Sequence, residues 1–531
     1  MAGARPTTLA LAAGARALDA EAAQWGLDAL ALVEAAGRAC ADALALELDA
    51  RGVPVRDARF VALAGGGNNA ADALVMLRAL VLCHGARAGR CRAYLVGDRG
   101  AGKGEASPLS QAALALRRLG ARVDAWDVLS AREELLGGAA PVEGPTVVAD
   151  GIAGTGLEGA LCGEALEMAL AAREARDSGA LVVSIDAPSG ARDGWNAGEP
   201  TVAADVTLAI EPRKLCLYAP ALRPSAGKIA GVGGLFPPEL IERHGDAELL
   251  TWESASARVP KIPPATHKYG RGVVEIRAGS HGAAGAAVLA ALGAQAAGAG
   301  IVRLAVDDAL YPVAACAVAC ASPGVMVTTE GALIEAESEG RFVPDAALLG
   351  PGWGRGADRA LELERYLARE GLPLVLDADA LALAKGATFG GRAILTPHVG
   401  EFAALSGVPA QEILADPARH AREFARRANA VLLLKSHVTF VASPDGRLAV
   451  IDGMNPALAA GGTGDALAGL CAGIAARMAR SAAFDPYDCA CAAAALLAEA
   501  AESAAGRFAG PEEIARAAAV LTGAAWLGGA P

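Results

Sequence analysis

Apolar runs alternate with helix-like stretches through the first half of the chain. The clearest case is an apolar run at 59–64, followed by glycines at 65–67 and a helical pattern that ends near Leu77. Residues 15–50 also show helical periodicity. Further strands are predicted at 91–97, 146–150, 181–185 and 204–210. Strands alternating with helices predict a parallel, doubly wound, Rossmann-like sheet, whose ligand residues gather beyond the carboxyl ends of the strands.

The second half repeats this alternation. The residues at 283–297 are mostly alanine and glycine and predict a packed internal helix, and 410–428 predicts a polar helix. Residues 438–451 predict a hairpin around Pro444-Asp445-Gly446. Strands are predicted at 273–278, 301–306, 346–349, 372–376, 392–395 and 431–434. We therefore expect two α/β domains, each with three layers in which helices cover both faces of a sheet.

Length and proline content set the expected domain boundaries. A chain of 531 residues is too long for a single core. Three prolines between 260 and 264 lie in a stretch of mixed charge without periodicity. We therefore predict a linker at 246–265, between an N-terminal domain at 1–245 and a C-terminal domain at 266–531.

Composition narrows the possible partners and the compartment. The net charge of −12 argues against nucleic acid or an anionic membrane as a partner. The ten cysteines form no CxxC pair, so we expect reduced thiols in a cytoplasmic protein rather than a disulfide or metal framework. The uncharged stretch at 283–302 contains Gln295 and many glycines, which favours a packed helix over a membrane span.

A glycine run in the second half carries the strongest candidate chemistry. Gly461-Gly462-Thr463-Gly464 is followed by Asp465 and then by a small-residue pattern with helical spacing. The backbone amides of such a turn, with the first turn of the next helix, form a pocket for an anion such as phosphate. Asp465 would take a proton from a hydroxyl that attacks the phosphate. The alternative is a glycine turn in which Asp465 only caps the helix.

Polar residues follow several predicted strands of this half. Asp377 and Asp379 follow one strand, and His398 follows the next. Lys435 ends an apolar run, where a lysine needs a partner, and a nucleotide phosphate is the natural one. The alternatives are that the carboxylates cap a turn and that His398 is an ordinary surface imidazole.

Four short motifs stand at strand ends of the first half: Gly67-Asn68-Asn69-x-x-Asp72, Asp150-x-x-x-Gly154-Thr155-Gly156, Asp186-x-Pro188-Ser189-Gly190 and Lys214. Together they resemble the NAD(P)H-hydrate epimerase family over about 15–244. The resemblance implies a potassium ion on Asn69, Asp150 and Ser189, and oxygen ligands suit that ion. It also implies catalytic proton transfer by Asp186 with Lys214. The substrate-binding residues implied are Asn68, Asn69, Asp72, Gly154, Thr155, Gly156 and Asp186.

One of these motifs departs from the family pattern. Ala70, Ala71 and Ala73 stand where the family has glycines. If one of these positions needs a positive φ, alanine strains the turn by about 1–2 kcal/mol. We therefore expect an impaired epimerase, and a degenerate domain kept only as a scaffold is the alternative.

The second half has its own ordered motifs: Leu376-Asp-Ala-Asp-Ala-Leu381, Leu395-Thr-Pro-His-x-Gly-Glu-Phe402, Leu434-Lys435 and the run from Gly461 to Asp465. They resemble the nucleotide-dependent NAD(P)H-hydrate dehydratase family, a ribokinase-like fold, over 261–527. The chain therefore resembles the fused, bifunctional repair enzymes of hydrated nicotinamide cofactors. The substrate-binding residues implied are Gly285, Gly352, His398 and Asp465. The nucleotide-binding residues implied are Lys435, Ser436, Gly461, Gly462, Thr463 and Gly464.

The resemblance implies two activities in one chain. The first domain would interconvert R- and S-NAD(P)HX, the hydrated cofactors. The second, with Mg²⁺, would dehydrate the S form to NAD(P)H and convert ADP to AMP and phosphate; ATP as the donor stays open. The rival interpretation is a ribokinase-like kinase of a hydroxymethylpyrimidine or thiazole alcohol. We expect a homo-oligomer without a nucleic-acid or membrane partner.

Overall fold

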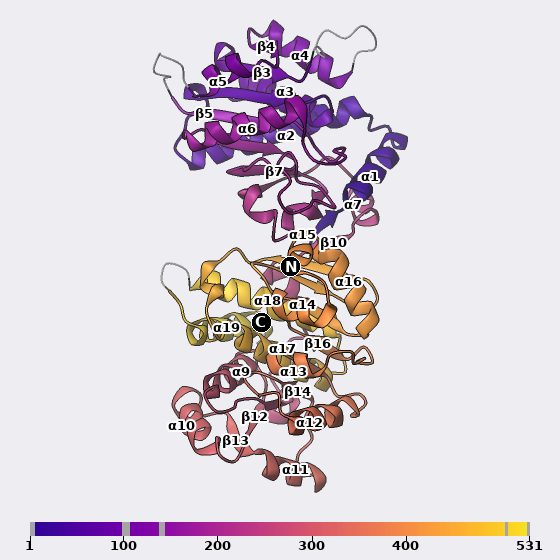
Figure 1. The fold of residues 1–531 in the computed structure, drawn as a ribbon, viewed down its shortest axis with the longest axis vertical. Coiled ribbons are helices and arrows are strands. Elements are labelled where there is room, and N and C mark those ends of the chain that lie inside the picture. The colour runs from indigo at the N-terminus through magenta and orange to yellow at the C-terminus, as the bar shows by residue number, and fades with distance from the viewer. Residues whose placement is uncertain (1–5, 98–106, 137–143, 505–507, 528–531) are drawn as a thin grey trace. The chain divides into compact units, whose positions relative to one another are not determined.

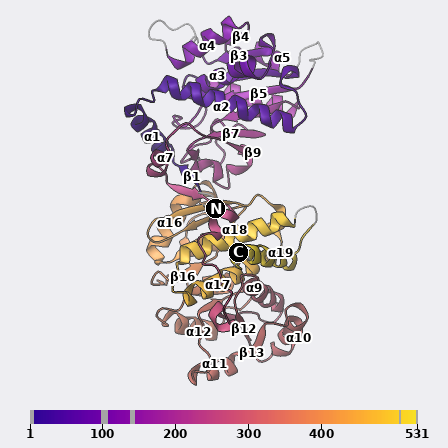
Figure 2. The same ribbon diagram turned by 180° about the vertical axis from the view of Figure 1, so that it is seen from behind.

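The computed structural model describes residues 6–97, 107–136, 144–504 and 508–527, drawn from two opposite sides in Figures 1 and 2. The contacts within the chain divide it into two compact units. The N-terminal unit spans Thr8–Ala247, and the C-terminal unit begins at Glu248.

The N-terminal unit is built on a seven-stranded parallel sheet in the order β4-β3-β2-β5-β6-β7-β9. The strands are β2 (Arg59–Ala64), β3 (Cys91–Leu95), β4 (Arg122–Ala125), β5 (Thr146–Gly151), β6 (Leu181–Ile185), β7 (Val206–Ile210) and β9 (Lys228–Val232). A short parallel pair joins β1 (Thr7–Ala10) to β8 (Arg213–Lys214). The helices are α1 (Ala12–Gln24), α2 (Ala29–Ala50), α3 (Asn68–Cys83), α4 (Pro108–Arg118), α5 (Val128–Leu136), α6 (Gly163–Asp177) and α7 (Pro238–Arg243).

Alternation along β2 separates two cores in this unit. Phe60 and Ala62 pack with α2, α3 and α4, whereas Val61 and Leu63 pack with α5 and α6. Successive side chains of a strand point to opposite faces, so helices cover both faces of the sheet. The predicted three-layer, doubly wound domain is confirmed.

The C-terminal sheet runs in the order β13-β12-β11-β14-β15-β16-β17-β18-β19-β10. It is parallel from β13 to β17, and β18 pairs antiparallel with both β17 and β19. The strands are β10 (Ala247–Leu249), β11 (Val273–Arg277), β12 (Ile301–Val306), β13 (Met326–Thr329), β14 (Ala346–Leu349), β15 (Leu374–Leu376), β16 (Ala393–Leu395), β17 (Val431–Leu434), β18 (Val438–Ala442) and β19 (Leu448–Asp452). The expected parallel sheet and hairpin are both present.

Helices of this unit lie on both sides of the sheet. The core on one side joins α9, α17, α18 and α19 to the strands, and a smaller core on the other side includes Leu333 of α11. The helices are α8 (Trp252–Ser256), α9 (Ala284–Ala296), α10 (Tyr311–Ala321), α11 (Glu330–Ser338), α12 (Ala357–Leu367), α13 (Ala378–Leu383), α14 (Val399–Ser406), α15 (Ala410–Ala415), α16 (Pro417–Ala428), α17 (Thr463–Arg480), α18 (Pro486–Ser503) and α19 (Pro511–Trp526).

Helices α9 and α17 cross in close contact, which explains the glycine and alanine content of both. A Cβ atom on Gly293 would lie 2.2 Å from the carbonyl oxygen of Ala466. A Cβ atom on Gly469 would lie 2.0 Å from the carbonyl oxygen of Ala290. The apolar stretch is therefore a packed internal helix, as predicted, and within the described ranges no helix is long and apolar enough to cross a membrane.

Three predicted segments differ from the structure. The stretch expected to be a single helix at 15–50 breaks at Gly26, which has φ 91°, and Asp28 then caps α2. The helix expected at 410–428 breaks before Pro417, because proline cannot donate the hydrogen bond that a continuous helix needs. The residues expected to form a linker at 246–265 contain β10 and α8, which pack in the C-terminal unit.

Candidate active sites

Three neighbouring strands of the C-terminal sheet bring polar residues together at their carboxyl ends. Asp377 follows β15, Thr396 follows β16 and Lys435 follows β17. Asp377 Oδ1 accepts hydrogen bonds from Lys435 Nζ and Thr396 Oγ1, both at 2.8 Å. The lysine therefore has a carboxylate partner, where the sequence suggested a nucleotide phosphate. Burial lowers the pKa of Lys435, but Asp377 outweighs this and the net shift is upward.

The glycine run stands beside this pair. Helix α17 begins at Thr463, after Gly462 with φ 97°, and Gly462 has no side chain to cap the helix. A Cβ atom on Gly464 would lie 3.2 Å from Lys435 Nζ. The lysine therefore lies against the start of α17, where the Thr463 amide donates to the carbonyl oxygen of Ala460 and a helix N-terminus can bind an anion.

Asp465 lies half-buried in the first turn of α17. Burial raises its pKa to about 6; Asp377 and Glu401 add to this rise, and Lys435 opposes it. A carboxyl group with a pKa near the working pH is suited to proton transfer. The structure therefore gives Asp465 the environment of a general base, and its catalytic role stays a prediction.

Other predicted residues of this half form hydrogen bonds with backbone atoms of their own loops. His398 is exposed, and its Nδ1 accepts the amides of Gly400 and Glu401 in a capping box at α14. Ser436 Oγ donates to the carbonyl oxygen of Val438, which lies two residues further along the chain. Thr463 Oγ1 donates to carbonyl oxygens of the preceding turn. Any contact of these residues with a ligand would use their remaining polar atoms.

The remaining predicted glycines lie around the start of α9. Gly352, with φ 56°, packs so closely that a Cβ atom would lie 2.7 Å from the Cβ of Ala283. Gly285 occupies the first turn of α9 and faces open space. A Cβ atom on Gly462 would lie 2.4 Å from Leu289, one turn further along α9. The structure therefore brings Gly285, Gly352 and the glycine run to one end of α9.

In the N-terminal unit, Asp150 is the centre of a buried hydrogen-bond network at the end of β5. Its Oδ2 accepts from Ser184 Oγ at 2.7 Å and from the Ser189 amide at 2.9 Å, and its Oδ1 accepts from Ser189 Oγ. Burial raises the pKa of Asp150, and the hydrogen bonds from Ser189 and Ser184 oppose that rise. Sequence reasoning missed Ser184, although a serine inside an apolar strand was a usable signal.

Asn69 connects this network to the start of α3. Its Nδ2 donates to the carbonyl oxygen of Ala153 at 3.2 Å, and Ser189 Oγ lies 3.1 Å from the same oxygen. Its Oδ1 is buried and has no hydrogen-bond partner among the described residues. Asn68, the first residue of α3, is exposed. The three predicted potassium ligands therefore lie in one cluster that holds an unused oxygen.

Asp186 and Lys214 form an ion pair, and their predicted role in proton transfer stays a prediction. Lys214 Nζ donates to Asp186 Oδ1 at 2.6 Å and to the carbonyl oxygen of Ile210 at 3.2 Å, and both side chains are buried. Asp186 has φ 65°, a conformation that strains a residue with a side chain and often marks a functional site. Burial raises the pKa of Asp72 well above its usual range, and Asp186 adds to this rise.

The predicted strain at the alanines is wrong. Ala70, Ala71 and Ala73 lie within α3, are buried, and have no positive φ. Their methyl groups pack into the core, and a Cβ atom on Gly151 would lie 2.8 Å from that of Ala73. Alanine suits a buried helix better than glycine, so the turn gives no reason to expect an impaired site.

The turn from Gly154 to Gly156 lies against α3 and α1. A Cβ atom on Gly154 would lie 3.2 Å from that of Asn69, whereas one on Gly156 would meet nothing within 4 Å. Arg16 of α1 donates to the carbonyl oxygen of Thr155 at 2.9 Å. Because Arg16 is 139 residues away in the sequence, no local pattern could have assigned it to this site.

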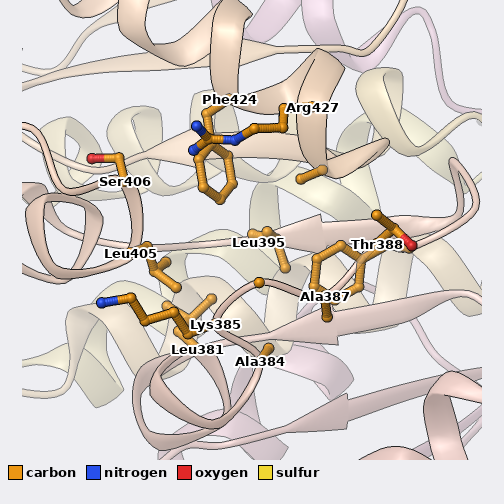
Figure 3. A pocket seen from close by; sticks show the side chains of 13 residues that line it. Leu381, Ala384, Lys385, Ala387, Thr388, Leu395, Leu405, Ser406, Phe424 and Arg427 are labelled. Carbon is orange, nitrogen blue, oxygen red and sulfur yellow. The ribbon is translucent and has the colours of Figure 1, made fainter.

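A cavity of about 340 Å³ lies elsewhere in the C-terminal unit (Figure 3). Its lining is mainly apolar and includes Leu381, Leu395 and Phe424, with Lys385 and Arg427 at its edge. Lys385 lies just after the end of α13, and Arg427 lies in the last turn of α16. Both cations therefore complement the negative C-terminal end of a helix. The cavity contains none of the predicted site residues.

Comparisons with known proteins match both halves of the chain. Residues 29–216 match the family described as YjeF-related protein N-terminus, and residues 274–518 match NAD(P)H-hydrate dehydratase. The bifunctional NAD(P)H-hydrate repair enzyme of Gloeobacter violaceus is 35% identical over 491 residues, which are 88% of this chain and 89% of that protein. The chain belongs to this family of bifunctional repair enzymes. The resemblance inferred from the motifs is thereby confirmed.

Single-domain relatives match the C-terminal half. The ADP-dependent (S)-NAD(P)H-hydrate dehydratase of Xanthomonas campestris is 37% identical over 236 residues, which are 43% of this chain and 80% of that protein. A crystal structure of the ADP/ATP-dependent dehydratase of Bacillus subtilis, co-crystallised with ATP and Mg²⁺, is 29% identical with a TM-score of 0.45. It covers 51% of this chain and 96% of that chain.

Proposed function

We propose that this chain repairs hydrated nicotinamide dinucleotides through two activities. The C-terminal domain, from Glu248 onward, dehydrates S-NAD(P)HX with ADP as the phosphoryl donor. The N-terminal domain, Thr8–Ala247, interconverts the R and S epimers and so supplies the S form. The observation that carries the proposal is Asp465, whose pKa of about 6 suits a base beside an anion-binding turn.

The dehydration follows from the poor leaving ability of hydroxide. Asp465 accepts the proton of the C6 hydroxyl. The hydroxyl oxygen attacks the β-phosphorus of ADP, and AMP leaves. The ring nitrogen lone pair then expels phosphate from C6, and loss of a proton from C5 restores the double bond. The amides from Gly461 to Gly464 and the nearby Lys435 stabilise negative charge on the moving phosphoryl group.

A magnesium ion fits the acidic side of this site. Mg²⁺ is usually bound by one or two carboxylates together with nucleotide phosphates. Glu401 lies near enough to Asp465 to add to the upward shift of its pKa, so two carboxylates face the same region. Such an ion neutralises phosphate charge when it is bound. Glu401 is the residue that would hold it together with the nucleotide phosphates, and Asp465 stays available to accept the proton.

The epimerase chemistry rests on the buried pair of Asp186 and Lys214. Epimerisation at C6 requires the ring to open and close again on the other face. Asp186 accepts the hydroxyl proton as the C6–N1 bond breaks and delivers that proton to N1, and both transfers reverse when the ring closes. Lys214, at 2.6 Å, orients the Asp186 carboxylate. Asn68, Asn69, Asp72 and the turn from Gly154 to Gly156 bind the rest of the substrate.

A potassium ion fits the cluster of Asn69, Asp150 and Ser189. Potassium prefers several oxygen ligands, and the buried Oδ1 of Asn69 has no other partner among the residues described. The carbonyl oxygen of Ala153 lies in the same hydrogen-bonded group. A bound ion supplies positive charge beside the substrate phosphates.

The deciding experiment measures recovery of reduced cofactor. The purified chain is mixed with S-NADHX and either ADP or ATP, and the absorbance of reduced nicotinamide is followed. We expect recovery with ADP and release of AMP and phosphate in equal amounts. A stable phosphorylated alcohol, with no return of absorbance, would instead support the rival small-alcohol kinase.

A further inference from the structure

Helix α1 carries two charged side chains that reach the N-terminal site from outside its motifs. Arg16 Nη1 donates to the carbonyl oxygen of Thr155, in the turn proposed to bind the substrate. Asp19, one turn further along α1, lies near enough to Lys214 and Asp186 for their charges to act on it. Burial raises the pKa of Asp19; Lys214 opposes this rise and Asp186 adds to it. One helix therefore faces both the glycine turn and the reacting groups.

Open space lies over the turn that Arg16 contacts and over the residue before α3. A Cβ atom on Gly156 would meet nothing within 4 Å, and the same holds for Gly67, just before α3. Asn69 joins the two elements, because its side chain packs on Gly154 and donates to Ala153. The amides at the start of α3 and the glycine turn thus border a space in which an anion can bind.

Apart from the proposed potassium ion, the side chains around the site supply little positive charge for an anionic dinucleotide. Asp72, Asp150 and Asp186 are buried there, and Lys214 is already paired with Asp186. Arg192 reaches the carbonyl oxygen of Gly159, but Glu199 neutralises it at 2.7 Å.

Arg16 differs from Arg192 in its surroundings. It is exposed, and within the described part of the chain it is paired with no carboxylate. A guanidinium has five N–H donors, and the hydrogen bond to Thr155 uses one of them. The remaining donors are available, in the planar arrangement that matches phosphate oxygens.

We propose that Arg16 binds a phosphate group of the hydrated dinucleotide in the N-terminal site. This inference rests on the proposed epimerase function and adds a residue that determines substrate affinity. The phosphate is either the pyrophosphate, common to NADHX and NADPHX, or the 2′-phosphate, which only NADPHX carries. The hydrogen bond to Thr155 orients the guanidinium for either contact.

The test uses the full chain without nucleotide, so that dehydration cannot proceed. Conversion of the R to the S epimer is measured above the spontaneous rate, over a range of NADHX and NADPHX concentrations. Arg16→Ala should raise KM roughly tenfold while kcat changes little, because the lost contact is with a remote phosphate. Arg16→Lys should recover part of the loss, since lysine keeps the charge but not the fork. Arg38→Ala, on the exposed face of α2, is the matched control.

The outcomes separate the possible roles of Arg16. A raised KM for both substrates supports a pyrophosphate contact, and a raised KM for NADPHX alone supports a 2′-phosphate contact. An unchanged KM for both, or a lower kcat and melting temperature without a change in KM, would mean that Arg16 only braces the turn. Absence of epimerisation in the wild type would contradict the proposed function instead. Calorimetric titration of NADPHX into the same variants would then still decide the Arg16 contact.

Discussion

The two proposed active sites each contain a lysine–aspartate ion pair, but the pairs stand in different relations to the reacting group. In the C-terminal site Lys435 pairs with Asp377, and the proposed base Asp465 stands beside the pair. In the N-terminal site Lys214 pairs with the proposed proton carrier Asp186 itself. The lysine–aspartate pair therefore stands beside the proposed base in the C-terminal site, whereas in the N-terminal site the pair itself contains the proposed proton carrier.

This difference explains why the two sites suit different chemistry. No described residue forms a hydrogen bond or ion pair with the side chain of Asp465, and burial raises the pKa of Asp465 to about 6. Such a base serves a phosphoryl transfer that needs one proton removed. Asp186 is fixed at 2.6 Å from an ammonium group, which suits a proton that must leave and return within one site.

The largest expected effect comes from Asp465→Asn. The amide keeps the size of the side chain but cannot accept the hydroxyl proton, so dehydration should fall by about 10²–10⁴-fold. Binding of ADP and epimerisation should remain near wild type, which would separate the two sites in one variant. Asp358→Asn, in the first turn of α12, is a matched control. Near-full dehydration by Asp465→Asn would remove this residue from the mechanism.

Replacing the two lysines by methionine tests the comparison next. Lys214→Met should reduce epimerisation by on the order of 10²-fold, because the lysine belongs to the proton-transfer pair.

Lys435→Met should move the acid limb of dehydration to higher pH, because Lys435 opposes the rise in the pKa of Asp465. An unchanged limb would mean that the lysine does not act on the base.

Much of the fold was predictable because each strand carries its own apolar run. The predicted strand at 301–306 coincides with β12, and the other predicted strands overlap strands of the two sheets. The breaks at Gly26 and Pro417 were missed because helical periodicity continues across them. The packing of 246–265 was missed because β10 is stabilised by β19, about 200 residues away, rather than by a local pattern.

The candidate sites were predictable where polar residues directly follow strands. Asp377 follows β15 and Lys435 follows β17, and their pairing depends on the strand order that places only β16 between them, which the sequence does not specify. The alanines of α3 were misjudged because a family comparison gives residue types and not backbone angles. Arg16 was missed because its contact depends on tertiary packing.

A smaller effect is expected at the potassium site. Ligand binding to the folded state alone stabilises by about 2.7 kcal/mol at 100 times Kd. The wild-type N-terminal unit should therefore melt at a higher temperature in potassium than in tetramethylammonium buffer. Asp150→Ala and Asn69→Ala should each abolish this difference, whatever their own stability. Equal melting of the wild type in the two buffers would contradict the site.

The smallest effect concerns the alanines of α3. Replacing Ala70, Ala71 and Ala73 together by glycine should lower stability by about 0.5–1 kcal/mol per residue, because glycine is unfavourable within a helix. Epimerase turnover should not rise. Thermal melting and the epimerisation rate check this prediction, and a faster epimerase would restore the idea that these methyl groups obstruct the substrate.

The most direct test of the account is the pH dependence of dehydration by the wild-type chain, measured as kcat/KM for S-NADHX at saturating ADP. The pKa of Asp465 is raised, so its carboxylate is present above about pH 6 and is protonated below. Activity should therefore be constant above neutral pH and fall tenfold per pH unit below about 6. If activity stayed constant from pH 8 down to the ordinary pKa of an exposed aspartate side chain, Asp465 would not be the base.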